Sequence, residues 1–171
     1  MENNFHTRKC VRLKQHNYNV PGAYFVTICT HNRKRTLSNI VGAIHESPVV
    51  ELQPYGKIVK KIIDSVPDNL GVIVDKCVIM PDHIHCVFVI TRATMERAIR
   101  ESPLRKRSII AKTVGYIKMT ATKKIHIDFK NQDTIWQRSY YEHIIRNKDD
   151  YDKIVEYMLE NPIKWFYKNR S

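Results

Sequence analysis

The stretch from Met80 to Ile90 constrains the fold more than any other part of the chain. Pro81 and Asp82 interrupt an apolar run over residues 72–80, and a second apolar run begins directly afterwards. Two strands joined by so short a connection lie side by side, so the sequence predicts an antiparallel pair here. The chain is therefore expected to fold around a β-sheet that contains this pair.

Two histidines, His83 and His85, begin the second strand of the pair. Because side chains alternate along a strand, both imidazoles point to one face of the sheet and Ile84 points to the other. The two positions are at most about 7 Å apart along the strand, which is close enough for both rings to bind one metal ion. The alternative is a partly buried histidine with a neighbour at the strand end.

Apolar periodicity defines the elements around this pair. In chain order we expect a strand (23–30), a weak hairpin (36–40 with 43–52), a helix (54–66), the two central strands (72–80 and 83–91), a helix (108–124), a strand (135–145) and a last helix (148–160). Two β-α-β units that meet around an antiparallel pair predict an α+β fold, with a ferredoxin-like antiparallel sheet, helices packed on one face and an added C-terminal helix that bears a tyrosine. Residues 21–171 are expected to form a single domain.

The net charge of +12 and the isoelectric point near 9.6 predict a polyanionic partner, for which nucleic acid is the commonest choice. Basic residues gather in an N-terminal arm (1–20), in a loop after the first strand and in a loop over residues 92–107; a solvated tail or loop remains the alternative for the arm and the last segment. The predicted DNA contacts in these segments are Arg8, Lys9, Arg12, Arg33, Lys34, Arg35, Arg105, Lys106 and Arg107. The sequence has no signal peptide and no run long enough to span a membrane, so we expect a cytoplasmic protein with no membrane partner.

A tyrosine on the last helix lies away from its predicted core face. At about 100° per residue, one arc of this helix holds Ile154, Val155, Met158 and Leu159, with Tyr151 in the middle as a packing residue. Tyr157 falls about 130° from the centre of that arc, and Asn161 falls on nearly the same line. Lys153 shares that side, where it can offset phosphate charge or favour a phenolate. The alternative for Tyr157 is an ordinary surface tyrosine.

A histidine pair, a tyrosine outside the core and a basic surface together fit one kind of chemistry. A phenolic oxygen can open a phosphodiester of single-stranded DNA when a cation neutralises the non-bridging oxygens. The histidines would hold the cation, and the tyrosine would take the 5′ phosphate as a covalent ester and release a 3′ hydroxyl. The ester conserves the bond energy, so rejoining needs no ATP.

Four separated motifs resemble those of the REP-associated tyrosine transposases, which are single-tyrosine HUH (His-hydrophobe-His) transposases. The motifs are GAYFVTICTHNR (22–33), VIMPDHIH (78–85), WQRSYYEHIIRN (136–147) and EYMLENPIKW (156–165). The resemblance covers about residues 20–165. It implies a ferredoxin-like fold, a Mg²⁺ or Mn²⁺ ion, and cleavage and joining of single-stranded DNA at hairpin-forming palindromes, that is, DNA transposition.

By position, the resemblance implies that Tyr157 is the nucleophile, that His83 and His85 are metal ligands, and that Asn161 is a third ligand. Asp82 stands where many relatives have Asn and, like Lys153, is a candidate for a supporting role beside the site. The chain also ends soon after Trp165, whereas some relatives have a longer tail that grips the hairpin. We therefore add Arg138 and Arg146 of the third motif to the predicted DNA contacts. His143 of the same motif is predicted to contact DNA or to support the site, and a structural role is the alternative.

Other functions remain as alternatives at this point. A non-catalytic ferredoxin-like module that binds nucleic acid would need exposed aromatics on the sheet, and Phe88 is almost the only ring on the central strands. A histidine-triad hydrolase would need a third histidine where Val87 stands. A replication initiator or relaxase would need a larger chain. The protein is expected to be a monomer or a homodimer, because the tyrosine helix can complete its own site or that of a second subunit.

Overall fold

The structure is a computed structural model that describes residues 20–42, 48–101 and 108–169. The predicted N-terminal arm lies, apart from its last residue, outside the described residues. Six of the predicted DNA contacts are therefore not described: Arg8, Lys9, Arg12, Arg105, Lys106 and Arg107.

Four strands form one antiparallel sheet in the order β4-β5-β1-β6. Their bounds are Gly22–Cys29 for β1, Ile73–Ile79 for β4, His83–Ile90 for β5 and Tyr141–Ile145 for β6. This order, with a helix between β1 and β4 and another between β5 and β6, is the predicted ferredoxin-like α+β arrangement. A separate hairpin pairs β2 (Ser38–Val41) with β3 (Val49–Leu52), where the sequence predicted a weak one.

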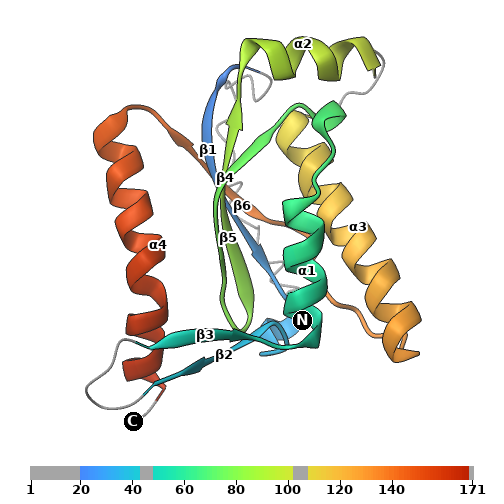
Figure 1. Ribbon diagram of the computed structural model, residues 1–171, viewed down its shortest axis with the longest axis vertical. Coiled ribbons are helices and arrows are strands. Elements are labelled where there is room, and N and C mark those ends of the chain that lie inside the picture. Colours follow the sequence, from blue (N-terminus) through green and yellow to red (C-terminus); the bar gives the residue numbers. More distant parts are fainter. Residues whose placement is uncertain (1–19, 43–47, 102–107, 170–171) are drawn as a thin grey trace, which may run out of the picture.

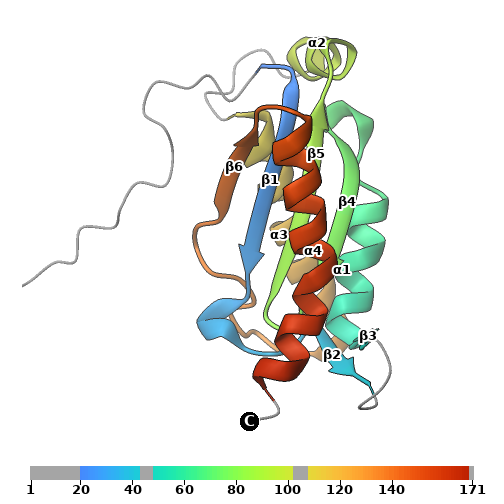
Figure 2. The ribbon, with the colours of Figure 1, turned by 90° about the vertical axis from the view of Figure 1, so that its left-hand side faces the viewer.

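Helices cover both faces of the sheet (Figures 1 and 2). Helices α1 (Pro54–Asp64) and α3 (Ile109–Phe129) lie side by side on one face, and α4 (Lys148–Lys168) crosses the other. Two 3₁₀ turns, η1 (His31–Arg33) and η2 (Asp68–Leu70), lie in the connections. Among the described residues, no helix is long and apolar enough to span a membrane.

The larger core lies between the sheet and the α1–α3 pair. On β5 every second side chain enters it, beginning with Ile84 and ending with Ile90. The helices contribute stripes at helical spacing, which on α1 are Val59, Ile62 and Ile63 and on α3 are Ile110, Val114, Ile117, Ala121 and Ile125. Ser108 caps α3, because its Oγ accepts a hydrogen bond of 3.2 Å from the backbone N–H of Ala111.

The face under α4 has a much smaller core. It consists of Phe25, Val87, Ile145 and Met158, with Tyr151 and Ile154 packed against it. Leu159 was predicted to belong to this core, but it is 67% exposed and that prediction is wrong. The helix meets the sheet along a narrow line of residues spaced three or four apart, and Leu159 lies outside that line.

Two further predictions are wrong. The segment expected to be a loop begins with helix α2 (Arg92–Glu101), because Thr91 and Thr94 cap its start reciprocally through their hydroxyls and backbone N–H groups, at 3.1 and 2.9 Å. Helix α4 was expected to end at Pro162 but continues to Lys168. Proline removes one backbone hydrogen bond from a helix, yet Pro162 is buried and the packing of this turn outweighs that loss.

Candidate active site

The two histidines converge at the start of β5, opposite Cys29 and Thr27 of β1. Their Nε2 atoms are 3.0 Å apart, and their ring centroids are 4.5 Å apart. His83 is 7% exposed and His85 is 3% exposed, while Ile84 between them belongs to the core on the opposite face. The predicted orientation of the pair is therefore confirmed.

Each imidazole is held through its other nitrogen. The Nδ1 of His83 lies 2.5 Å from a carboxylate oxygen of Asp82, and the Nδ1 of His85 lies 2.9 Å from the hydroxyl of Thr27. Because an ionised carboxylate only accepts hydrogen bonds, Nδ1 of His83 donates to Asp82, and in the neutral ring Nε2 then carries the lone pair on the side of His85. Arg33 lies 3.6 Å from the second oxygen of Asp82.

The charge states of these groups follow from their surroundings. Burial, followed by the charges of His83 and Arg33, lowers the pKa of His85 to about 3, so this ring is neutral at pH 7. Burial raises the pKa of Asp82, but the hydrogen bond from His83 and the charges of His83 and Arg33 together lower it below its ordinary value. An ionised carboxylate therefore orients a ring whose other nitrogen is available as a ligand.

Helix α4 brings a stripe of side chains over the histidines. The ring of Tyr157 lies 5.4 Å, centroid to centroid, from that of His85 and 6.1 Å from that of Phe25. One turn later, the side-chain amide nitrogen of Asn161 lies 3.3 Å from Nε2 of His85. The next turn places Trp165 6.1 Å from His83. Residues four apart share a helix face, so one stripe of α4 meets both histidines.

A cavity of about 570 Å³ separates this stripe from the sheet. The residues that line it are Phe25, Thr27, Cys29, Arg33, His83, His85, Tyr141, Tyr157, Asn161, Lys164, Trp165 and Lys168. Tyr157 is 44% exposed. The predicted nucleophile therefore borders an open cavity that also reaches the two nearly buried imidazoles.

The cavity contains a second possible nucleophile besides the phenols, the thiol of Cys29. Burial raises the pKa of Cys29 and outweighs the opposing effect of the Arg33 charge. The thiol is therefore protonated at neutral pH and is a poor nucleophile there.

Three side chains fit a hard divalent ion in this cavity. Two donors about 2.1 Å from an octahedral ion and at a right angle to each other are about 3.0 Å apart, which is the separation of the two Nε2 atoms. The amide of Asn161 can turn its oxygen towards the same point. Within residues 20–42, 48–101 and 108–169, no group of three or more His, Cys, Asp or Glu side chains could hold a metal. A ligand set here consists of two imidazoles and an amide.

In the loop after β1, three consecutive basic side chains point in different directions. Arg33 points to Asp82, Lys34 lies 3.7 Å from Asp133, and Arg35 lies over the ring of Trp165 at 5.3 Å. Arg35 also donates a hydrogen bond of 2.6 Å to Asn169, near the end of α4. The turn that achieves this has two left-handed residues, Asn32 and Arg33, with φ of 52° and 54°.

The structure places other predicted residues away from the cavity. Lys153 is not among the described residues that line it, whereas Lys164, on the same helix, is. His143 lies 3.1 Å from a carboxylate oxygen of Asp150 and so connects β6 to the first turn of α4. Arg138 and Arg146 are exposed on either side of β6. Contact of these two arginines and of His143 with DNA stays a prediction.

Sequence reasoning missed several residues of the cavity. From the sequence, Phe25 and Thr27 could be recognised only as residues of a core strand. The register of β1 and β5, in which Thr27 pairs with His85, places both of them at the cavity. Lys164 and Lys168 were missed because the last helix was predicted to end at residue 160, before Pro162. They continue the line of Tyr157 and Asn161 by one and two turns.

Comparison with known proteins gives consistent relatives, although no protein-family model matches the chain. The chain is 32% identical over 94% of its length to a Haemophilus influenzae protein described as uncharacterized, of which it covers 91%. It is 24% identical over 84% of its length to the REP-associated tyrosine transposase of Escherichia coli K12, of which it covers 67%. Its fold matches that of a REP-associated tyrosine transposase solved with a REP hairpin, with a TM-score of 0.61 and 21% identity over 90% of this chain and 74% of the other. The chain therefore belongs to the family of REP-associated tyrosine transposases.

Proposed function

We propose that this transposase is a metal-dependent endonuclease and strand transferase of single-stranded DNA, which acts at hairpins through a covalent 5′-phosphotyrosine intermediate. The observation that supports the proposal best is that one chain gathers Tyr157, both imidazoles and the amide of Asn161 at one cavity. The phenol and the imidazoles need no second subunit to meet, so a monomer can assemble the site, and a homodimer would contain two such sites.

In the proposed reaction the phenolic oxygen of Tyr157 attacks the phosphorus of one phosphodiester. A bond forms between this oxygen and phosphorus while the bond from phosphorus to the 3′ oxygen breaks. The phenolic proton passes to water, and the departing oxygen takes up a proton to become a 3′ hydroxyl. One phosphoester replaces another, so attack by a 3′ hydroxyl on the phosphotyrosine joins a strand without ATP.

Side chains around the cavity supply the remaining requirements. His83, His85 and Asn161 would hold a Mg²⁺ or Mn²⁺ ion, which when bound supplies positive charge beside the non-bridging oxygens. Asp82 keeps His83 in the tautomer that exposes Nε2. Arg33, Lys164 and Lys168 line the same cavity and would attract the phosphates on either side of the reacting one. Lys153 was predicted to offset phosphate charge beside the site. In this proposal Lys164 has that role, and Asp82 orients His83.

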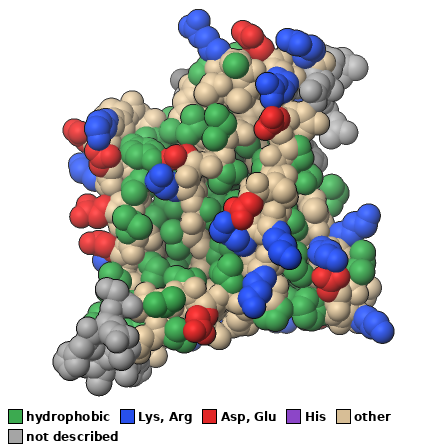
Figure 3. Space-filling view, in the orientation of Figure 1, with side chains coloured by type: hydrophobic (Ala, Val, Ile, Leu, Met, Phe, Trp, Pro, Cys, Tyr) green, Lys and Arg blue, Asp and Glu red, His purple; other side chains and the backbone are tan. Residues whose placement is uncertain are grey.

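The surface charge supports a nucleic-acid substrate. In the orientation of Figure 1, Lys and Arg side chains gather over α1 and α3, while acidic side chains lie along the outer edge of α4 (Figure 3). The relative with the matching fold was solved with a hairpin of DNA repeats. That basic surface lies on the opposite side of the sheet from the cavity, whereas Arg33, Lys164 and Lys168 line the cavity itself and would attract the unpaired flank as it enters the site.

A binding module without catalysis is less well supported. Phe88, the ring that such a module would use on the central strands, is fully buried against α1 and α3. The other face of the sheet is crossed by α4 (Figure 2). Stacking of bases on the sheet would require α4 to leave.

The decisive experiment is to trap the covalent intermediate. Hairpin oligonucleotides with randomised unpaired flanks are mixed with protein and Mg²⁺ or Mn²⁺, and adducts that resist SDS are counted. Tyr157→Phe removes the attacking oxygen and should abolish the adduct, with binding of the oligonucleotide largely intact.

A matched control comes from the second tyrosine of the cavity. Tyr141 is 45% exposed and lines the same space, so Tyr141→Phe tests whether any phenol in the cavity can react. The proposal expects this variant to retain the adduct. An adduct that persists in Tyr157→Phe and disappears in Tyr141→Phe would show that Tyr141, and not Tyr157, is the nucleophile. If the unmodified protein forms no adduct, the proposed function is wrong.

A further inference from the structure

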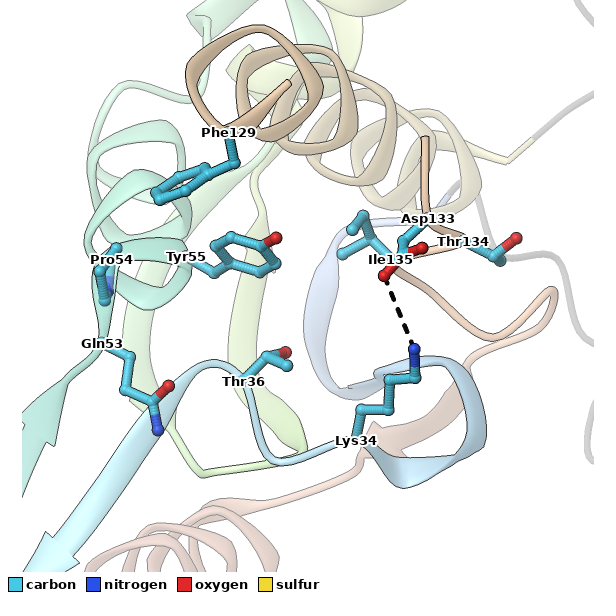
Figure 4. Close-up of a pocket in the computed structure, with 9 residues that line it drawn as sticks. All are labelled: Lys34, Thr36, Gln53, Pro54, Tyr55, Phe129, Asp133, Thr134 and Ile135. Carbon is cyan, nitrogen blue, oxygen red and sulfur yellow. Dashed lines mark ion pairs between the residues drawn. The ribbon is translucent and has the colours of Figure 1, made fainter. Parts of the chain in front are cut away.

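A second cavity lies on the other side of the β1–β2 loop, between the first turn of α1 and the end of α3 (Figure 4). Its volume is about 220 Å³, which is below the roughly 300–1,000 Å³ of pockets for drug-sized ligands. The residues that line it are Lys34, Thr36, Gln53, Pro54, Tyr55, Phe129, Asp133, Thr134 and Ile135. The reaction proposed above uses none of them.

One side of this cavity is aromatic. The rings of Tyr55 and Phe129 are 4.9 Å apart, centroid to centroid, and inclined by 62°. Asn131 donates a hydrogen bond of 2.5 Å to the hydroxyl of Tyr55, which fixes the ring. Phe129 is 41% exposed although it is large and apolar. The pair therefore presents a fixed aromatic surface to solvent, which suits the flat face of another ring.

The facing side is polar and charged. Lys34 and Asp133 form an ion pair of 3.7 Å across the cavity from the two rings, and Thr36 lies between Lys34 and Tyr55 (Figure 4). His126 contacts the carbonyl oxygen of Asp133 at 2.8 Å and holds this loop against α3. The cavity thus combines stacking surface, hydrogen-bonding groups and one cation that can pair with an anion.

The backbone at this cavity is closely packed as well. Gly56 follows Tyr55, and a Cβ atom at this position would overlap with the carbonyl oxygen of Leu37. The first turn of α1 can approach the β1–β2 loop only because position 56 is glycine. This contact fixes Tyr55 relative to Lys34 and so sets the width of the cavity.

The same loop connects this cavity to the candidate active site. Arg33 lines the active-site cavity and Lys34 lines the second one. Successive Cα atoms are about 3.8 Å apart, so the two cations lie on opposite sides of a single turn. A DNA strand that leaves the active site along this loop meets Lys34 within a short distance.

We propose that this second cavity binds one unpaired nucleotide of the DNA substrate, with its base against Tyr55 and Phe129 and a phosphate beside Lys34. The identity of the ligand as DNA rests on the proposed function. A carboxylate accepts hydrogen bonds and donates none, so Asp133 would accept a hydrogen bond from a donor on the base, such as an exocyclic amino group. The cavity would select one base in the unpaired flank, a few nucleotides from the scissile phosphate.

The test measures affinity and not cleavage. The Tyr157→Phe variant selects a tightly bound hairpin from oligonucleotides with random flanks, and each flank position is then made abasic in turn. Stacking of one base contributes about 1–3 kcal/mol, so loss of the bound base should weaken binding roughly tenfold at a single position. Phe129→Ala, added to Tyr157→Phe, should weaken binding of the intact oligonucleotide by a similar factor and have no further effect on that abasic one.

Two variants separate stacking from a change in structure. Phe129→Leu keeps an apolar side chain without a π face and should resemble Phe129→Ala. Ile127→Ala, on the same helix and 62% exposed but outside this cavity, should bind normally. Lys34→Gln should reduce the slope of log affinity against log salt by about one.

The inference is overturned if Phe129→Ala leaves the affinity unchanged, or weakens intact and abasic oligonucleotides equally. Failure of the proposed function is a different result, because the covalent adduct plays no part in this measurement. A protein that forms no adduct but shows a base-specific loss at one position would keep this site. A protein that forms adducts without any such loss would keep the proposed function alone.

Discussion

The two faces of the sheet differ in what they contain. On β5, Ile84 and Phe88 enter a continuous core under α1 and α3, whereas His83 and His85 face a cavity under α4. Neighbouring residues of one strand therefore serve different purposes: alternate side chains hold the fold or build the site. Substitutions on one face should change stability, and substitutions on the other should change chemistry.

The helices follow the same division. Helices α1 and α3 pack through broad apolar stripes, but α4 contacts its face mainly through Met158 and the side chains near it. A hydrogen bond of 2.5 Å from the hydroxyl of Tyr151 to Asp75 on β4 supports this thinner contact. A helix that carries the proposed nucleophile to a cavity cannot fill that cavity, so its packing is limited.

The largest effect is expected on the face of the cavity. The double substitution His83→Ala with His85→Ala should lower cleavage of a hairpin oligonucleotide at least about a thousandfold, because it removes both imidazole ligands for the ion. Treatment of the unmodified protein with EDTA should produce the same loss, and added Mg²⁺ or Mn²⁺ should restore it. Full cleavage in EDTA would contradict a metal role for this pair.

Substitutions on the opposite face of the sheet should change the free energy of unfolding. Ile84→Ala removes a fully buried side chain from the core between the two histidines, and should lower the free energy of unfolding by about 2–5 kcal/mol. Urea denaturation followed by circular dichroism measures this change. Adduct formation by the protein that remains folded should be normal. If Ile84→Ala lowered adduct formation without lowering the free energy of unfolding, the two faces would not have separate roles in stability and chemistry.

The free energy of unfolding should depend on pH because the imidazole of His85 is buried. In the unfolded chain His85 takes up a proton near pH 6.5, but in the folded protein its pKa is about 3. Between these values the unfolded chain binds more protons, so the free energy of unfolding should fall as the pH decreases from about 6.5 towards 3. Urea titrations in EDTA at several pH values should show a shallower fall for His85→Gln.

The smallest effect concerns the attachment of α4. Tyr151→Phe removes the hydrogen bond to Asp75 and should lower the free energy of unfolding by about 0.5–1 kcal/mol, because the bond is exposed to water. Tyr167→Phe, at a 58% exposed position on the same helix, is the matched control and should have no effect. Equal losses from both substitutions would argue against this hydrogen bond as an attachment.

The sequence predicted the parts of the molecule that depend on local periodicity. The alternation of His83, Ile84 and His85 sufficed to place the imidazoles on one face, and the helical angle of Tyr157 sufficed to place it outside the core. The antiparallel pairing of β4 with β5 followed from the short connection at Pro81 and Asp82. These features are determined by residues close together in the chain, so they need no knowledge of tertiary contacts.

Features that depend on distant packing could not be predicted in the same way. Pro162 is a strong signal for the end of a helix, and its burial, which the local sequence does not reveal, accompanies the continuation of α4. The hydroxyl of Thr27 and the ring of Phe25 join the site through the register of β1 and β5. The second cavity combines Tyr55, Lys34 and Phe129 from separate elements, and no motif relates them.

The left-handed turn at Asn32 and Arg33 has a consequence for engineering a more heat-resistant variant. A left-handed conformation costs a non-glycine residue roughly 1–2 kcal/mol, and asparagine tolerates it better than arginine does. Glycine at position 33 would relax the backbone and raise the melting temperature, but it would also remove the guanidinium beside Asp82. Screens that select for thermal tolerance alone would therefore tend to enrich for impaired enzymes at this position.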